Sequence, residues 1–339
     1  MKIGFKVQGN EGEFQYPHET YHKFTDALGT ALDQRNYGEL STPAYIATLK
    51  KLLKEEPDFI DGYAHLGLAL LEQGKTNKAL EACLMGVSVG EKALPKNYAG
   101  QAPWYCLDNR PFLRALHGAI CCTIRLRRRK IAVEQIETLL RYNPDDNQGV
   151  RYLLGSEYLR LGKMQPAREI LEQEAPHYPP CQYDLALLYL ERGNMITAAT
   201  SLRRGFLANP YIAEILCGNP NPIPLVISHG SNYAEPEIAR DYVEMYGDYW
   251  QRRPDCIHIL HWILNHPKVM RERAEYQALR AELLWAQEPE ARRAIVERIS
   301  AIEREIDDTL SKEIVAHRAD ETGQTIAPWI NPKRSMMRI

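Results

Sequence analysis

Two histidines three residues apart, His258 and His261, are the side chains of this 339-residue sequence whose spacing most suggests metal chemistry. Residues three apart share one face of a helix, and Cys256 and His266 lie close enough in the chain to complete a ligand set. The stretch CIHILHWILNH (256–266) is otherwise apolar and lacks the HExxH or paired CxxC patterns of zinc sites. The pattern therefore favours a buried helix, and we expect no metal.

A second candidate is RLRRRK (125–130), in which five of six residues are basic. Such clusters bind nucleic acid by neutralising its phosphates. No aromatic side chain is interleaved for base stacking, and a formal net charge of −2 provides no general attraction for polyanions. A solvated basic turn is favoured, and a nucleic-acid binder is kept as an alternative function.

Seven cysteines form the third group, and Cys83, Cys121, Cys122 and Cys256 sit in apolar, helix-like stretches without a CxxC pair. An odd number of unpaired thiols is typical of a reducing compartment. A nucleophilic role would require a neighbouring base or cation, which the sequence does not reveal. We expect these thiols to be structural.

The composition is that of a folded soluble chain, with 45% apolar and 25% charged residues. The N-terminus, MKIGFKVQGNEGEF, lacks the apolar core of a signal peptide. No stretch approaches the roughly 20 apolar residues that span a bilayer. We expect a cytoplasmic protein that binds neither membrane nor cofactor.

The segments that must position these side chains form a sequence repeat. GSEYLRLGKMQPA (155–167) and ALLYLERGNMITA (186–198) match at their small and apolar positions, and GLALLEQGKTNKA (67–79) has the same skeleton. A degenerate copy, ICCTIRLRRRKIA (120–132), has Arg127 in place of the turn glycine. The apolar residues recur at helical spacing, and the glycine stands where a helix ends in a left-handed cap. Each unit is predicted to be a helix, a short turn and a second helix.

Prolines close the units at Pro57, Pro144, Pro179 and Pro210, because proline cannot continue a helix interior. A helical pair with small crossing residues and a terminal proline resembles the tetratricopeptide repeat (TPR), whose usual period is about 34 residues. The resemblance covers residues 41–210. It implies an all-α fold, a TPR-type helix-turn-helix solenoid.

A narrower resemblance lies in NRPFLRALHG (109–118), YNPDDNQGVRYLL (142–154), NPYIAEILCG (209–218) and HGSNYAEPEIARDYVEMYGDYW (229–250). Their order is similar to that of a TPR subfamily that includes the suppressor-of-tumorigenicity proteins and bacterial relatives. This resemblance, over residues 104–262, implies a helical repeat fold and no enzymatic activity. Vertebrate members are associated with membranes, but that property does not transfer to a sequence without an apolar spanning stretch.

In a TPR solenoid the first helix of each pair lines a concave groove, so polar residues beside the packing positions of those helices face a partner. The expected lining is basic, amide-rich and aromatic, which suits an acidic or C-terminal peptide segment gripped by guanidinium groups. The predicted partner-binding residues are Arg110, Arg114, His117, Arg125, Asn147, Gln148, Arg151, Tyr152, Ser156, Arg160 and Tyr183. In the alternative interpretation, the arginines pair within the repeats with Asp108, Asp145, Asp146 and Glu157.

An enzyme or metal-dependent regulator is the remaining alternative, and it would use the module at residues 211–267. Asn219, His229, His258 and His261 would be its first candidate residues. No P-loop, GxSxG or GxGxxG motif is present, and repeat solenoids rarely build closed pockets. We therefore expect a non-enzymatic adaptor.

The ends of the chain differ from the repeats. We expect an N-terminal cap (1–40), TPR-like repeats (41–210), a family-specific helical module (211–267), a charged helical segment (268–318) and a tail (319–339). Ile295, Ile299, Ile302 and Ile306 recur at coiled-coil spacing after Pro289, which favours an antiparallel hairpin over pairing with a second copy. Monomer and homodimer both stay open. Three interpretations of the tail stay open, namely a flexible end, a docked segment or a partner motif. Its apolar anchors are Ile326, Trp329, Ile330, Met336 and Met337.

Overall fold

A computed structural model describes residues 1–319 and 323–330 of the chain. The chain folds into two compact units, Met1–Leu161 and Gly162–Ile339. Unit 1 has a core cluster that runs from Phe24 to Cys122, and unit 2 has a second cluster around its C-terminal helices. Among the described residues, strands occur only as two short hairpins.

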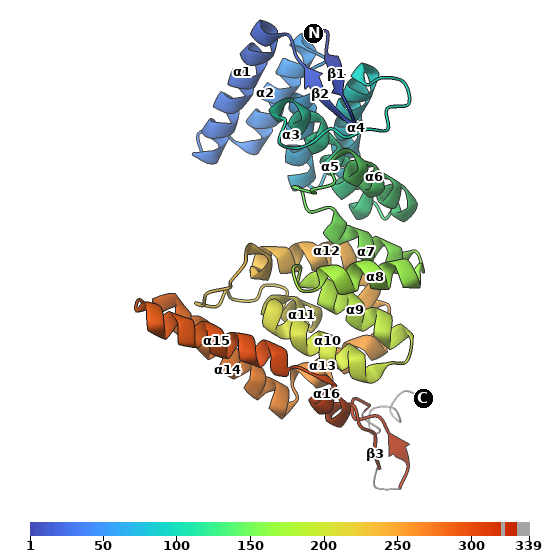
Figure 1. The fold of residues 1–339 in the computed structure, drawn as a ribbon, viewed down its shortest axis with the longest axis vertical. Coiled ribbons are helices and arrows are strands. Elements are labelled where there is room, and N and C mark those ends of the chain that lie inside the picture. The colour runs from blue at the N-terminus through green and yellow to red at the C-terminus, as the bar shows by residue number, and fades with distance from the viewer. Residues whose placement is uncertain (320–322, 331–339) are drawn as a thin grey trace. The chain divides into compact units, whose positions relative to one another are not determined.

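Unit 1 begins with a β-hairpin and continues with helices that pack on their neighbours, so that α3, α4 and α5 all contact one another (Figure 1). Its elements are β1 (Gly4–Gln8), β2 (Glu11–Gln15), α1 (His18–Asn36), α2 (Thr42–Glu55), α3 (Ile60–Glu72), α4 (Thr76–Ala93), the 3-10 turn η1 (Leu107–Asn109), α5 (Arg110–Arg125), α6 (Arg129–Tyr142) and α7 (Arg151–Arg160).

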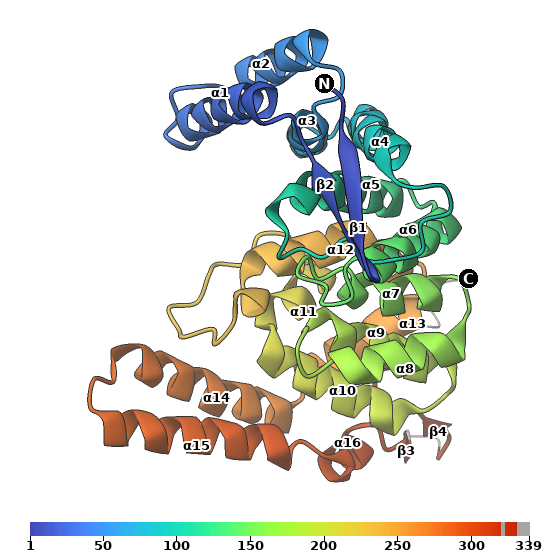
Figure 2. The same cartoon turned by 45° about the horizontal axis from the view of Figure 1, so that its top comes forward.

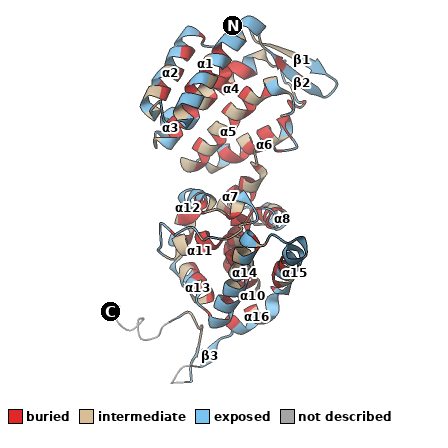
Figure 3. Ribbon diagram, turned by 90° about the vertical axis from the view of Figure 1, so that its left-hand side faces the viewer, coloured by how far each residue is buried: buried red, intermediate tan, exposed pale blue. Residues whose placement is uncertain are grey.

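The hairpin pairs antiparallel, from Gly4 opposite Gln15 to Gln8 opposite Glu11. Strand β1 lies near the start of the chain, and helix α1 follows the hairpin. Each helix of unit 1 buries one face, as the banding of α2 to α6 shows (Figure 3). Amphipathic spacing in the sequence produces this pattern.

Turn glycines end helices α3, α7 and α9 in the left-handed region, with φ of 69° at Gly74, 72° at Gly162 and 73° at Gly193. The predicted helix–turn–helix units are confirmed at these turns. Arg127 takes the same place after α5, with φ of 60°. A side chain in this conformation is strained because its Cβ crowds the following carbonyl.

Replacing Arg127 by glycine is therefore expected to raise the stability of unit 1 by about 0.5–1 kcal/mol, since glycine adopts a positive φ without this strain. The neighbouring Arg128, whose φ is −85°, is the matched control. Chemical denaturation should show Arg127→Gly to be more stable than the wild type and Arg128→Gly not to be. A destabilised Arg127→Gly variant would contradict this explanation.

Unit 2 continues the helical pairs, and then adds a long hairpin. Its elements are α8 (Met164–Glu174), α9 (Pro180–Glu191), α10 (Met195–Ala208), α11 (Pro210–Leu216), the 3-10 turn η2 (Asn232–Ala234), α12 (Pro236–Gln251), α13 (Pro254–Leu264), α14 (Pro267–Trp285), α15 (Pro289–Glu305), α16 (Asp308–Ile314), β3 (Arg318–Ala319) and β4 (Thr325–Ile326).

Helices α14 and α15 lie side by side as the predicted hairpin (Figure 2). Pro289 begins α15, as expected of a residue tolerated in a first helical turn. The isoleucine stripe of α15 is buried against Tyr276 and Leu283 of α14, so its partner is a helix of the same chain. The expected all-α class, its TPR-type helix pairs and the C-terminal helical hairpin are all confirmed.

The described part of the tail returns to unit 2. Strand β3 pairs antiparallel with β4, and the ring of Trp329 meets that of His317 edge-on at 6.2 Å. Pro328, Trp329 and Ile330 border a hollow of about 660 Å³ beside α13. The anchors Met336 and Met337 lie outside the described residues. Within the described ranges, no helix combines the length and apolar content needed to cross a bilayer.

Candidate functional site

A mostly apolar pocket of about 220 Å³ lies between α3 and α5 in unit 1. These are the first helices of two successive pairs, the position at which the repeat pattern predicted a partner surface. Helix α3 supplies Ala64, His65, Gly67, Leu68 and Leu71, and helix α5 supplies Arg114, His117, Gly118 and Cys121.

Two glycines shape the floor of this pocket. A Cβ on Gly67 would lie 2.2 Å from the Sγ of Cys83, and a Cβ on Gly118 would lie 2.7 Å from the same sulfur. Helices α3 and α5 therefore approach α4 closely around Cys83. Leu68 stands at the mouth with 53% of its surface exposed, although the repeat pattern marks its neighbours as core. An exposed leucine over an apolar hollow is typical of a binding surface rather than of solvated helix.

An ion pair forms the polar edge of the pocket. Arg114 donates from Nε and Nη2 to the two carboxylate oxygens of Asp61, at 2.9 and 2.7 Å. Asp61 is buried, so this two-bond pair fixes the guanidinium beside the apolar lining. Both bonds use Nε and Nη2, which leaves the Nη1 amino group for a further acceptor such as a ligand carboxylate.

Two histidines complete the lining. The Nδ1 of His65 lies 3.1 Å from the hydroxyl of Tyr45, and burial lowers the pKa of His65, so its ring is neutral at pH 7. His117 behaves in the opposite way, because its interaction with the neighbouring Cys121 raises the pKa of His117. The Nε2 of His117 lies 3.6 Å from the Sγ of Cys121.

Of the residues predicted to bind a partner, Arg114 and His117 line this pocket. Arg110 is engaged nearby, where its Nε donates to the carbonyl of Trp104 at 3.0 Å and its guanidinium lies over that indole ring. Gln148 donates to the carbonyl of Leu113. These contacts hold the segments around α5 in place.

Arg151 follows the alternative interpretation, since it pairs with Asp146 at 3.1 Å and donates to the carbonyl of Pro144. Arg160 donates to the carbonyl of Ser156 one turn earlier, and Ser156 itself is buried. Asn147 is exposed, whereas Arg125 and Tyr152 are partly buried. These residues lie outside the α3–α5 pocket.

Tyr183 belongs to unit 2, and the structure does not place it on a partner surface. Its side chain is 0% exposed, and its hydroxyl donates to the carbonyl of Asn209 at 2.9 Å. The apolar character of α9, which is buried along most of its length, explains this outcome. A helix buried on all sides gives no amphipathic signal from which an exposed face can be read.

The residues of the metal alternative do not converge. His258 and His261 are exposed on α13, whereas Cys256 is buried. His229 pairs with the hydroxyl of Tyr211 at 2.6 Å, and Asn219 donates to Glu214. In the described part of the chain, no three His, Cys, Asp or Glu side chains are grouped to hold a metal ion.

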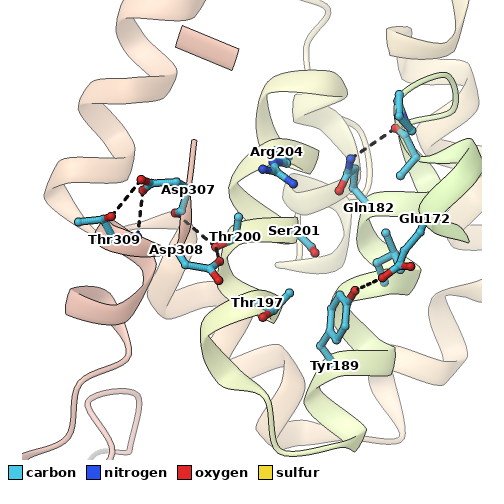
Figure 4. A pocket seen from close by; sticks show the side chains of 13 residues that line it. Glu172, Gln182, Tyr189, Thr197, Thr200, Ser201, Arg204, Asp307, Asp308 and Thr309 are labelled. Carbon is cyan, nitrogen blue, oxygen red and sulfur yellow. Dashed lines mark hydrogen bonds between the residues drawn. The ribbon is translucent and has the colours of Figure 1, made fainter. Parts of the chain in front are cut away.

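A larger hollow of about 590 Å³ lies in unit 2, among α8, α9, α10 and the turn before α16 (Figure 4). Its polar groups bond mainly to one another. Glu172 accepts a hydrogen bond from Tyr189 at 2.6 Å, and Thr200 donates to Asp308 at 2.6 Å. This network fastens α16 to α10, so we assign the hollow a structural role and take the apolar α3–α5 pocket as the candidate site.

The fold and site define a helical-repeat protein of TPR type, with an apolar pocket on the first helices of its pairs. No family model and no curated protein matches the chain. Among solved structures, it is similar to a tetratricopeptide repeat protein from Parabacteroides merdae, with 16% identity over 82% of this chain and 98% of that one and a TM-score of 0.45. The narrower subfamily resemblance stays a prediction.

A second similarity is to a chain in the structure of Naa15/Naa10 bound to HypK-THB. The identity is 15%, the TM-score is 0.35, and the match covers 87% of this chain and 45% of that one. The assignment of TPR-type repeats depends on the helix pairs and turn residues of this chain.

Proposed function

We propose that this chain is a non-enzymatic, cytoplasmic adaptor that binds an extended peptide segment of a protein partner over the α3–α5 pocket. The partner inserts one apolar side chain beside Leu68 and places a carboxylate against Arg114. The observation that carries the proposal is an apolar pocket of about 220 Å³ whose edge holds a fixed guanidinium. An apolar hollow with a small number of converging polar groups is typical of specific ligand sites.

The chemistry of the lining defines the ligand. Leu68, Leu71 and Ala64 offer apolar contact, which favours a leucine- or phenylalanine-sized side chain. Arg114 favours a carboxylate, supplied by an acidic residue or by the C-terminus of the partner. The glycines Gly67 and Gly118 let α3 and α5 pack closely on Cys83 of α4, which holds the two lining helices in place.

A library of hexapeptides with free C-terminal carboxyl groups tests this proposal. Peptides with a bulky apolar residue next to a carboxylate should be enriched on the immobilised full chain. Amidation of a selected peptide whose only carboxylate is terminal should weaken binding about tenfold, the loss expected for a charge-assisted hydrogen bond of about 1.4 kcal/mol. If the free-acid and amidated forms of the peptide bound equally well, the proposed role of Arg114 would be contradicted.

Leu68→Glu should weaken the selected peptides at least about tenfold, because it replaces apolar contact with a charge that repels the ligand carboxylate. Met85→Glu is the matched control, since Met85 is a 51% exposed apolar residue on α4 outside the pocket. Fluorescence anisotropy should give wild-type affinity for the control. Unchanged affinity for Leu68→Glu, with circular dichroism showing a folded chain, would contradict the proposed site.

A further inference from the structure

The pocket between α3 and α5 contains a thiol and an imidazole that peptide binding does not explain. His117 and Cys121 are one turn apart on α5, and the Nε2 of His117 lies 3.6 Å from the Sγ of Cys121. Both side chains line the pocket. A thiol is activated as a nucleophile when a neighbouring base takes its proton and the resulting cation stabilises the thiolate.

The surrounding groups favour this pair. Asp61 is paired with Arg114, and desolvation lowers the pKa of the partly buried His65, so neither places an unpaired charge beside the thiol at pH 7. On the α4 side, Cys83 interacts electrostatically with Cys121, and its hydrogen bond with Cys122 and its burial raise the pKa of Cys83. Asp146 favours the protonated form of His117.

We propose that Cys121 is a site of covalent modification, at which an apolar α,β-unsaturated carbonyl compound enters the pocket and is attacked by the thiol with His117 as the base. His117 accepts the thiol proton, and sulfur forms a bond to the β-carbon of the ligand. The electron pair of the carbon–carbon double bond moves to the α-carbon, which then takes the proton from the imidazolium. The addition needs no oxidant and releases no leaving group.

The shape of the pocket selects the electrophile. An apolar cavity of about 150 Å³ holds a benzene ring, so a pocket of about 220 Å³ has room for a six-membered ring attached to the reactive group. Small polar electrophiles lack such a ring and make less contact with the apolar lining. Modification would also fill the peptide pocket, a consequence that rests on the proposed function.

The other cysteines of the chain provide internal controls. Cys106 and Cys217 are partly buried, as is Cys121, whereas Cys83, Cys122, Cys181 and Cys256 are buried. Burial raises the pKa of Cys106, and it raises the pKa of Cys217 to about 11. Both thiols should therefore react slowly at mildly acidic pH.

The test treats the full chain with a limiting amount of N-cyclohexylmaleimide or N-ethylmaleimide at mildly acidic pH. Mass spectrometry of the digest, with fragmentation to separate Cys121 from Cys122, gives the labelling rate of each cysteine. Cys121 should label at least about tenfold faster than Cys106 and Cys217, and it alone should prefer the cyclohexyl reagent. Labelling of Cys121 no faster than Cys106 would overturn the proposal.

His117→Gln should slow labelling of Cys121 about tenfold and leave the rate at Cys106 unchanged, because it removes the base while keeping the size of the side chain. An unchanged rate at Cys121 would overturn the role of His117. The preference between the two maleimides in the wild type requires no variant, so it tests the site even if His117→Gln does not fold. Labelling is measured without any peptide, so a negative labelling result can be told apart from a negative result in the peptide-binding experiments.

Discussion

Arg203→Ala is expected to lower the free energy of unfolding of unit 2 by about 3 kcal/mol. The guanidinium of Arg203 is 2% exposed and donates from Nε and Nη2 to Glu272 of α14, at 3.0 and 2.5 Å. Its Nη1 donates to the carbonyl of Asp307 and to the hydroxyl of Ser311, at 2.8 and 2.9 Å. Loss of the arginine removes all four bonds and leaves the carboxylate of Glu272 without its guanidinium partner.

Unfolding by denaturant checks this expectation through tryptophan fluorescence, because four of the five tryptophans lie in unit 2. Arg298→Ala is the control, since Arg298 lies on α15 of the hairpin that Arg203 contacts. Arg298 pairs with Glu275 and Glu305 at the surface, where such pairs contribute about 0–1 kcal/mol. Equal losses for the two variants would show that burial of Arg203 does not set its contribution.

Asn109→Ala should destabilise unit 1 by about 3 kcal/mol, since it removes three hydrogen bonds to buried or partly buried main chain. Asn109 is 0% exposed; its Oδ1 accepts from the amide of Phe14 at 3.0 Å, and its Nδ2 donates to the carbonyls of Gly12 and Pro103, at 3.0 and 3.1 Å. These bonds attach strand β2 to the start of α5.

Hydrogen exchange measured by mass spectrometry should show faster exchange in residues 4–15 of Asn109→Ala, because the hairpin loses its two bonds to Asn109. Asn147→Ala provides the control, since Asn147 is exposed and its replacement should change stability by no more than about 0.5 kcal/mol. Unchanged exchange in the hairpin of Asn109→Ala would contradict the role of Asn109.

The repeat pattern predicted the helix pairs because the features that form them are local. Apolar spacing defines each helix, and a glycine or Arg127 at the left-handed position defines each turn. The isoleucine stripe of α15 was likewise sufficient to predict a hairpin, since such a stripe must be covered and the preceding helix is the nearest partner. Local signals of this kind can be identified in a single sequence.

The contacts that attach distant segments had no such signal. Asn109 bonds to a strand 95 residues earlier in the sequence, and Arg114 pairs with Asp61 across 53 residues. The sequence patterns suggested acidic partners only within the same repeat region, so Asp61, the true partner of Arg114, was missed. An ion pair between two helices depends on their packing, which sequence spacing alone does not specify.

The candidate site was predicted in part. The register placed Arg114 and His117 on the partner face of α5, and both line the pocket. His65, Leu68 and Cys121 were missed, because the α3 stretch was interpreted only as packing and the thiols only as structural. The spacing of four between His117 and Cys121 is visible in the sequence, but their accessibility depends on the glycines that hold α3 and α5 against α4.

A hydrogen-exchange footprint tests peptide binding over the α3–α5 pocket most directly. The full chain would be measured with and without the tightest hexapeptide from the free-carboxyl library. We expect the peptide to slow exchange in residues 60–72 and 110–125, and Leu68→Glu to abolish this effect. Slowed exchange confined to other helices, such as α8 to α10 or α13, would contradict it.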